Sequence, residues 1–167
     1  MEKVRVCLIG CGRAGMIHAR AYNSQVVGAE LIAICDPFDE SLRSAQQELN
    51  VKYTYTDYHD VMKNEEIDAV VVVTPTKLHK EIVVAAANAH KNVFCEKPMA
   101  ESKQECEEMI EACKINNVKL QVGFMRRIDT SLVALLKLTL VALIQYANAP
   151  SPIVSVIGAI SMLESFV

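Results

Sequence analysis

A lysine stands between a carboxylate and a proline in the tripeptide Glu96-Lys97-Pro98, which follows a short apolar run at residues 92–95. Short apolar runs of this kind are typical of buried strands, so Lys97 is expected where a strand ends. An ammonium group held there can stabilise negative charge that develops on a reacting oxygen, and it can assist the movement of a proton. The alternative is a solvated loop lysine without a chemical role.

A glycine fingerprint near the start of the chain gives this lysine a context. The segment Gly10-Cys11-Gly12-Arg13-Ala14-Gly15 follows an apolar run at residues 4–9. Between a strand and a helix, such spacing is typical of dinucleotide binding. The first glycine permits a tight turn, the second lets the backbone approach a pyrophosphate, and the third lets helix and strand pack closely. The helix N-terminus then offers N–H groups to the phosphates.

Asp36 lies 21 positions after Gly15, where the second apolar run ends. An acid about 20 residues beyond the fingerprint is expected to bind the adenine ribose hydroxyls. A carboxylate at this position repels a 2′-phosphate, so the sequence favours NAD over NADP. The alternative is that Asp36-Pro37 only starts a turn and caps the next helix.

Thr74-Pro75-Thr76 follows a run of valines at the edge where ligands bind in open α/β sheets. One interpretation places this loop along the dinucleotide, between its two riboses, with His79 one turn into the next helix. The alternative is that Thr76 caps the helix that begins near Lys77, and that His79 is a partly exposed helix histidine.

Composition excludes several other functions. The net charge of −3 provides no basic surface for nucleic acid. None of the six cysteines forms a CxxC pair, so we expect no metal site and a reduced, cytoplasmic protein without a secretory signal. Cys7, Cys35 and Cys95 lie in apolar runs, where free cysteine behaves as a small hydrophobic residue.

Strand-like and helix-like segments alternate along the chain and would position these residues. Strands that are apolar throughout indicate burial on both faces, and the alternation predicts a doubly wound parallel sheet of the Rossmann type. The expected strands span residues 4–9, 30–35, 52–56, 68–73, 93–95 and 118–122, and the expected helices span 14–25, 40–49, 58–63, 78–89 and 103–116.

Taken in order, these motifs resemble one family. They are similar to the motifs of the Gfo/Idh/MocA oxidoreductases. The motifs are the glycine fingerprint, Asp36-Pro37, the Thr74-Pro75-Thr76 loop with His79, Glu96-Lys97-Pro98 and a final segment at residues 122–127. Within that family the chain looks most like the inositol 2-dehydrogenases. The resemblance covers about residues 2–129.

The resemblance implies an NAD-dependent oxidoreductase that acts on polyols or sugars. Lys97 then corresponds to the family's catalytic lysine beside the nicotinamide, and Glu96 orients that lysine or contacts the nicotinamide ribose. Pro98 resembles a family proline that follows a cis peptide bond. The cofactor-binding set that we expect is Gly10, Cys11, Gly12, Arg13, Ala14, Gly15, Met16, Asp36, Thr74, Pro75, His79, Glu96 and Lys97.

Residues 129–167 depart from the family. They hold only three charged side chains and no histidine, so the family's distal acid–base partner has no counterpart there. We expect residues 1–128 to form the dinucleotide-binding domain, followed by an apolar tail of a truncated or interrupted chain that essentially lacks the second domain. Residues 132–147 are too short, with Lys137 inside, for a membrane anchor to be expected. A helix over residues 132–146 is possible, and the apolar tail could drive association.

Two functions therefore remain open. The first is an NAD-dependent inositol or sugar dehydrogenase, in which Lys97 is catalytic and the chain alone turns over slowly. The second is a non-catalytic NAD-binding module that lacks the substrate domain.

Overall fold

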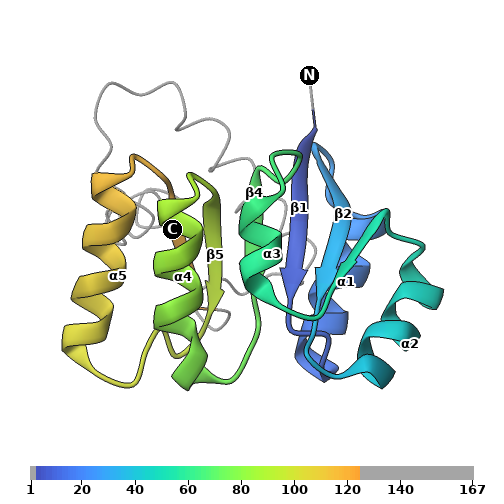
Figure 1. Cartoon of the computed structure of the whole chain (residues 1–167), viewed down its shortest axis with the longest axis horizontal. Coiled ribbons are helices and arrows are strands. Elements are labelled where there is room, and N and C mark those ends of the chain that lie inside the picture. The colour runs from blue at the N-terminus through green and yellow to red at the C-terminus, as the bar shows by residue number, and fades with distance from the viewer. Residues whose placement is uncertain (1–2, 125–167) are drawn as a thin grey trace, which may run out of the picture.

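The computed structural model describes residues 3–124, in which six strands form a single sheet (Figure 1). All neighbouring strands are parallel, and their order across the sheet is β3-β2-β1-β4-β5-β6. The strands are β1 (Val4–Ile9), β2 (Ala29–Cys35), β3 (Tyr53–Tyr55), β4 (Ala69–Val72), β5 (Asn92–Glu96) and β6 (Leu120–Gly123).

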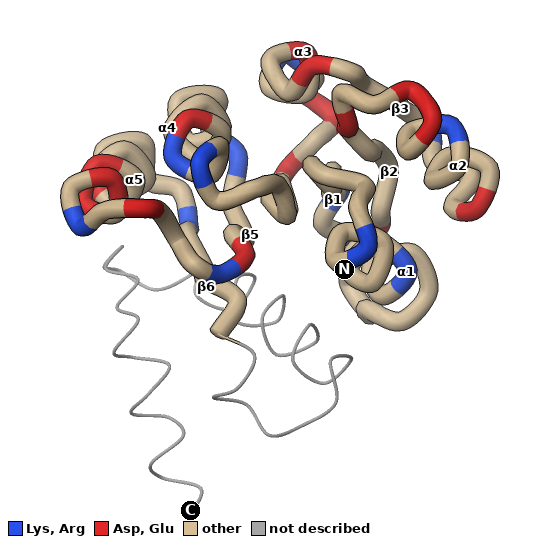
Figure 2. The backbone as a smooth tube through the Cα atoms, turned by 90° about the horizontal axis from the view of Figure 1, so that it is seen from below, with Lys and Arg blue, Asp and Glu red and all other residues tan. Residues whose placement is uncertain are grey.

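Helices cover both faces of this sheet, as the view from below shows (Figure 2). Helices α1 and α2 pack on one face, and α3, α4 and α5 pack on the other. The helices are α1 (Arg13–Ser24), α2 (Asp39–Leu49), α3 (Tyr58–Lys63), α4 (His79–Asn88) and α5 (Lys103–Ile115), and a 3₁₀ turn, η1 (Thr76–Leu78), precedes α4. The predicted doubly wound parallel sheet is therefore confirmed.

Each central strand contributes side chains to two separate cores. In β1, Val6 and Leu8 face the core under α1 and α2, whereas Cys7 and Ile9 face the core under α3, α4 and α5. Because successive side chains of a strand point to opposite faces, a strand buried on both faces must be apolar at every position. The valine-rich and isoleucine-rich runs of the sequence meet this requirement.

The strand cysteines fill space in these cores, as predicted. Cys7, Cys35 and Cys95 are buried in the core under α3, α4 and α5. Burial is the main cause that raises the pKa of the Cys35 and Cys95 thiols to about 12, so both remain protonated near neutral pH. Among residues 3–124, no group of His, Cys, Asp and Glu side chains could hold a metal ion.

The start of the fourth helix differs from the prediction. Thr76 does not cap α4, because Thr76–Leu78 forms a 3₁₀ turn in which the Leu78 N–H donates to the Pro75 carbonyl at 2.9 Å. The residue that precedes α4 is Leu78, which provides no side-chain cap. The tighter turn satisfies backbone groups that a threonine cap would otherwise have satisfied.

Some predictions concern residues that the structure does not describe. The described range ends at residue 124. It does not include Arg126, Arg127, the possible helix from residue 132 onward or the whole 129–167 segment. Within residues 3–124, no helix is long and apolar enough to cross a membrane.

Candidate active site at the carboxyl edge of the sheet

The predicted site residues follow the carboxyl ends of four neighbouring strands. Gly10 follows β1, Asp36 follows β2, Thr74 lies two positions beyond β4, and Lys97 follows β5. The arrowheads of β1, β2 and β5 point to the lower edge of the sheet in Figure 1. The strand order reverses between β1 and β4, and ligands of doubly wound sheets bind in the crevice at such a switch point.

The three glycines of the fingerprint differ in what surrounds them. Gly10 has a φ of +103°, and a Cβ there would lie 2.6 Å from the Val73 carbonyl oxygen. A Cβ on Gly15 would overlap the Gly10 carbonyl oxygen. A Cβ on Gly12, in contrast, would have no atom within 4 Å. Gly10 and Gly15 are therefore required by the fold, whereas Gly12 leaves open space at the start of α1.

That open space belongs to a hollow beside the glycine loop. The hollow has a volume of about 430 Å³, and Cys11, Gly12, Arg13 and Met16 line one side of it. Residues of α2, including Ser41 and Ser44, line the opposite side. Gly12 is the N-cap of α1 and provides no side-chain acceptor for the first N–H groups of the helix. These donors and the adjoining space fit a phosphate-bearing ligand.

Asp36 connects the glycine loop to the end of β2. One carboxylate oxygen accepts a hydrogen bond from the Cys11 N–H at 2.7 Å, and the other accepts from the Phe38 N–H at 2.9 Å. The second bond forms the turn that the simpler interpretation of Asp36 predicts, but the side chain does not cap α2, whose N-cap is Phe38. Each oxygen keeps a further lone pair for a ligand hydroxyl.

The Asp36 carboxylate also influences the neighbouring thiol. Burial, and then the negative charge of Asp36, raise the pKa of Cys11 to about 12. Cys11 is consequently a neutral part of the loop near pH 7, and its backbone N–H is the group that the carboxylate binds.

His79 is buried, with 1% of its surface exposed, so the expectation of a partly exposed helix histidine is wrong. Its ring lies between two loops of the site, because Nε2 is 2.9 Å from the Thr74 carbonyl oxygen and Nδ1 is 2.9 Å from the Pro98 carbonyl oxygen. A neutral ring donates to only one of these acceptors. The burial follows from position, since His79 shares the core-facing side of α4 with Ile82 and Val83.

The Thr74 side chain does not face an open space. Its hydroxyl is buried and has no hydrogen-bond partner in the described part of the chain. Pro75, in contrast, is exposed at the same edge. Thr74 therefore contributes its backbone to the site, through the contact between its carbonyl oxygen and His79.

Glu96, Lys97 and Pro98 lie where β5 leaves the sheet, as the sequence predicts. The Lys97–Pro98 peptide bond is cis, which confirms the expectation for this proline. The Glu96 Oε2 atom accepts a hydrogen bond from the Lys97 N–H at 2.9 Å. Lys97 itself is exposed, and its ammonium group forms no hydrogen bond or ion pair with another residue of the 3–124 range. The side chain is therefore available to a ligand.

His18 on α1 completes this arrangement, although the sequence analysis did not single it out. Its Nε2 atom lies 2.9 Å from the Glu96 Oε1 atom, and its ring is 3% exposed. The signal that could have found it is its spacing of three positions from Gly15, which places both residues on the side of α1 that packs on the sheet.

Burial and hydrogen bonds have opposing effects on Glu96. Burial alone would raise the pKa of this carboxyl group. The hydrogen bond from His18, then the backbone N–H of Lys97 and the charges of both residues, hold its pKa below the usual value. Glu96 is therefore a carboxylate at neutral pH, beside the lysine that could act in chemistry.

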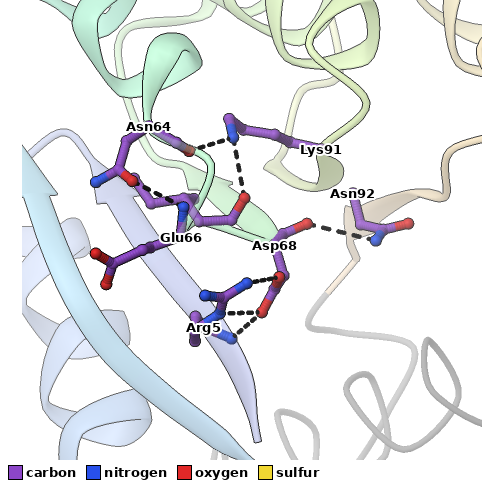
Figure 3. A network of polar contacts seen from close by, with 7 residues as sticks. Arg5, Asn64, Glu66, Asp68, Lys91 and Asn92 are labelled. Atoms are coloured by element: carbon purple, nitrogen blue, oxygen red, sulfur yellow. Dashed lines mark hydrogen bonds and ion pairs between the residues drawn. The ribbon is translucent and has the colours of Figure 1, made fainter.

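A larger hollow, of about 530 Å³, lies at the opposite, amino edge of the sheet. Several polar groups at this edge already bind one another, as Figure 3 shows. The Lys91 ammonium donates to the carbonyl oxygens of Asn64 at 2.7 Å and Ile67 at 2.9 Å, and Arg5 binds the Asp68 carboxylate. We therefore place the candidate active site at the carboxyl edge.

Comparison with known proteins identifies relatives of this chain. A family model described as an oxidoreductase family with an NAD-binding Rossmann fold matches residues 4–124. The inositol 2-dehydrogenase of Salmonella typhimurium is 35% identical over 130 residues, which cover 77% of this chain and 39% of the relative. The NAD-binding fold and the cofactor NAD, both predicted from the sequence, are confirmed at the level of the family.

Solved structures give the same result. The myo-inositol 2-dehydrogenase of Lactobacillus plantarum is 42% identical, with a TM-score of 0.73 over 78% of this chain and 39% of that protein. The scyllo-inositol dehydrogenase of Lactobacillus casei, solved with NAD(H) and scyllo-inositol, is 34% identical, with a TM-score of 0.74 over 78% of this chain and 38% of that protein. The chain thus spans less than half the length of the relatives it matches.

Proposed function

Because this chain belongs to the Gfo/Idh/MocA oxidoreductase family, we propose that it binds NAD at the carboxyl edge of its sheet and serves hydride transfer from the hydroxyl-bearing carbon of a polyol. The observation that carries the proposal is the convergence at one edge of the glycine loop, Asp36 and the Glu96-Lys97-Pro98 turn. The cofactor-binding domain of this proposal comprises residues 1–128.

The residues present fit the dinucleotide. The open space at Gly12 and the uncapped N-terminus of α1 suit a pyrophosphate, which would also contact Arg13, Ala14 and Met16. Asp36, with its remaining lone pairs, suits the adenine ribose hydroxyls and disfavours a 2′-phosphate. Backbone groups of Thr74 and Pro75, held by His79, would border the middle of the cofactor.

The chemical role that we assign to Lys97 follows from its exposed ammonium group, which has no partner within residues 3–124. NAD, when bound, supplies the hydride acceptor. The ammonium of Lys97 binds the reacting hydroxyl, favours alkoxide character on its oxygen, and provides a route for the proton. Glu96 fixes the backbone from which Lys97 projects and places negative charge beside the ammonium group.

The substrate class that we propose is a cyclic polyol or a related sugar. Relatives at 35% to 42% identity are inositol dehydrogenases. The chain covers less than half of their length, which favours an alternative in which these 167 residues alone bind NAD with little or no turnover. The two functions share the cofactor site and differ in catalysis.

A fluorescence titration of the 167-residue chain with NADH tests the shared part. We expect saturable binding that is tighter for NADH than for NADPH, and a preference for NADH that Asp36→Asn reduces. Absence of binding at millimolar NADH would refute the proposal.

Turnover separates the two functions. Reduction of NAD should be measured with myo-inositol and scyllo-inositol, using the chain and its Lys97→Met variant. Lys103→Met is the matched control, because Lys103 is an exposed lysine on α5 whose contact is the Glu107 carboxylate. We expect slow turnover that is abolished in the Lys97 variant alone, with NADH affinity kept within about twofold in both. No turnover in any form, together with intact NADH binding, would favour the non-catalytic alternative.

A further inference from the structure

The contact between His18 and Glu96 joins two parts of the molecule that are 78 positions apart in the sequence. His18 belongs to the helix that follows the glycine loop, and Glu96 ends β5 next to Lys97. The histidine ring also packs against Phe94, with ring centroids 5.4 Å apart. The imidazole is thus fixed by a ring contact on one side and by the carboxylate on the other.

The surroundings of the ring determine which nitrogen carries the proton. An ionised carboxylate can only accept, so the Nε2 atom of His18 must donate to Glu96. The Nδ1 atom is buried and has no partner among the described residues. A proton on Nδ1 would be a buried donor without an acceptor, which is unfavourable. The geometry therefore favours the tautomer with its proton on Nε2.

The Glu96 carboxylate is enclosed on three sides. Its Oε1 atom receives the His18 hydrogen bond, and its Oε2 atom receives the Lys97 N–H. On β6, a Cβ at Gly123 would lie 3.1 Å from Oε1 and 2.8 Å from the Phe94 ring, so only glycine leaves room for the carboxylate in this position. The side chain of Glu96 has one arrangement that satisfies all these neighbours.

We propose that His18 is a positioning residue, which holds the Glu96 carboxylate so that Glu96 in turn holds the backbone of Lys97 at the carboxyl edge. The link from position to catalysis rests on the function proposed above for Lys97. The contacts themselves do not depend on it. A merely structural histidine would fill space beside Phe94 without influencing the carboxylate or the lysine backbone.

The test is an NMR titration of the Glu96 side-chain carboxyl carbon in the full chain without cofactor. The titratable groups whose charges act on Glu96 are His18 and Lys97, and the neighbouring Cys95 thiol remains protonated in this range. In His18→Leu, which lacks a donor, we expect the Glu96 midpoint to move up by about one pH unit. In His18→Gln, the side-chain amide N–H extends about as far as the imidazole and can donate to Glu96. We therefore expect most of this shift to be reversed.

A matched control distinguishes the contact from the loss of any histidine. His59 also binds a carboxylate, with its Nδ1 atom 2.7 Å from Asp57, but on the exposed surface of α3. His59→Gln should leave the Glu96 titration unchanged. The Lys97 amide signal should follow the Glu96 titration in the wild-type chain and respond less in His18→Leu. Equal Glu96 midpoints in His18→Leu and the wild type would overturn the proposal.

A second measurement needs no variant. Long-range ¹H–¹⁵N correlation spectra of the wild-type chain report the tautomer of each histidine, and we expect His18 to carry its proton on Nε2. A proton on Nδ1 alone would overturn the proposal even if the variants did not fold. Failure of the chain to bind NADH would instead contradict the proposed function and leave these results unaffected.

Discussion

The two edges of the sheet use polar residues in opposite ways. At the amino edge, Lys91 is 4% exposed, and its ammonium group donates to two backbone carbonyls (Figure 3). At the carboxyl edge, Lys97 is exposed, and only its backbone N–H has a hydrogen-bond partner in the described range. The Lys91 ammonium group is thus bound within the fold. Lys97 is held through its backbone N–H, and its ammonium group is available to a ligand.

This difference shows why the larger hollow is not the better candidate site. At the amino edge, Lys91 and Asp68 are already hydrogen-bonded, so a ligand that bound them would have to displace existing hydrogen bonds. At the carboxyl edge, the described part of the chain leaves open space at Gly12 and provides no partner for the Lys97 ammonium group. Loss of a polar group should therefore affect folding at the amino edge and ligand binding at the carboxyl edge.

The largest expected effect distinguishes two glycines within the carboxyl edge. Gly15→Ala places a methyl group onto the Gly10 carbonyl, so we expect the free energy of unfolding to fall by about 3 kcal/mol or more. Gly12→Ala is the matched control, because its methyl group meets no atom within 4 Å and its φ of −68° suits alanine. Gly12→Ala should change the free energy of unfolding by less than about 0.5 kcal/mol but weaken NADH binding. Urea unfolding and NADH titration measure the two effects.

The next largest effect compares the two lysines directly. Lys91→Met leaves the carbonyl oxygens of Asn64 and Ile67 without their donor, so we expect a loss of about 2 kcal/mol in the free energy of unfolding. Lys97→Met should change it by less than about 0.5 kcal/mol. Equal losses in urea unfolding would contradict the distinction between a structural and an available lysine.

A smaller effect concerns the pH dependence of the amino edge. Burial opposes the ionisation of Asp68, but its hydrogen bonds from Arg5 hold its pKa below the usual value. A lowered carboxyl pKa adds stability above the unfolded-state pKa of about 4, and this stability is lost as the pH falls below it. The Asp68 side chain is 36% exposed, so we expect Asp68→Asn to cost only about 1 kcal/mol at pH 7.

Urea unfolding at pH 7 and at pH 3 checks this expectation. The difference between the wild type and Asp68→Asn should shrink at the lower pH, because Asp68 then becomes protonated in the unfolded chain and, progressively, in the folded one. A difference that stays constant between these pH values would show that the ion pair with Arg5 is not its source.

The smallest expected effect concerns Thr74. Valine has the same shape and removes a buried hydroxyl that has no partner in the described residues, so Thr74→Val should leave the free energy of unfolding unchanged or raise it by up to about 1 kcal/mol. NADH affinity should stay within about twofold, since the backbone carbonyl is the group that meets His79. A large loss of affinity would show that the hydroxyl reaches the cofactor and would revise the position of this loop.

Local patterns in the sequence were sufficient to predict the sheet and its helices. Apolar runs such as residues 6–9 of β1 are typical of strands buried on both faces, and the fingerprint from Gly10 to Gly15 is typical of the connection from a strand to a helix. These features depend on neighbours within one turn or one strand. The order of elements therefore agrees with the prediction, apart from details such as the 3₁₀ turn before α4.

The histidines show where such reasoning stops. Sequence reasoning gave no role to His18 and did not predict the burial of His79. Their partners are Glu96, 78 positions away, and Pro98, 19 positions away. No local pattern specifies which face of each helix meets the turn after β5. The packing of α1 and α4 on opposite faces of the sheet determines it.

The sequence by itself determined the parallel sheet, the family and the residues at the ends of its strands, because these follow from short-range spacing and burial. The tertiary structure alone decided which of those side chains are hydrogen-bonded within the fold and which are available to a ligand. It placed His18 against Glu96 and His79 between Thr74 and Pro98, and it left the Lys97 ammonium group without a partner among residues 3–124. Such contacts join distant segments, so only the packed fold brings their atoms within hydrogen-bond distance.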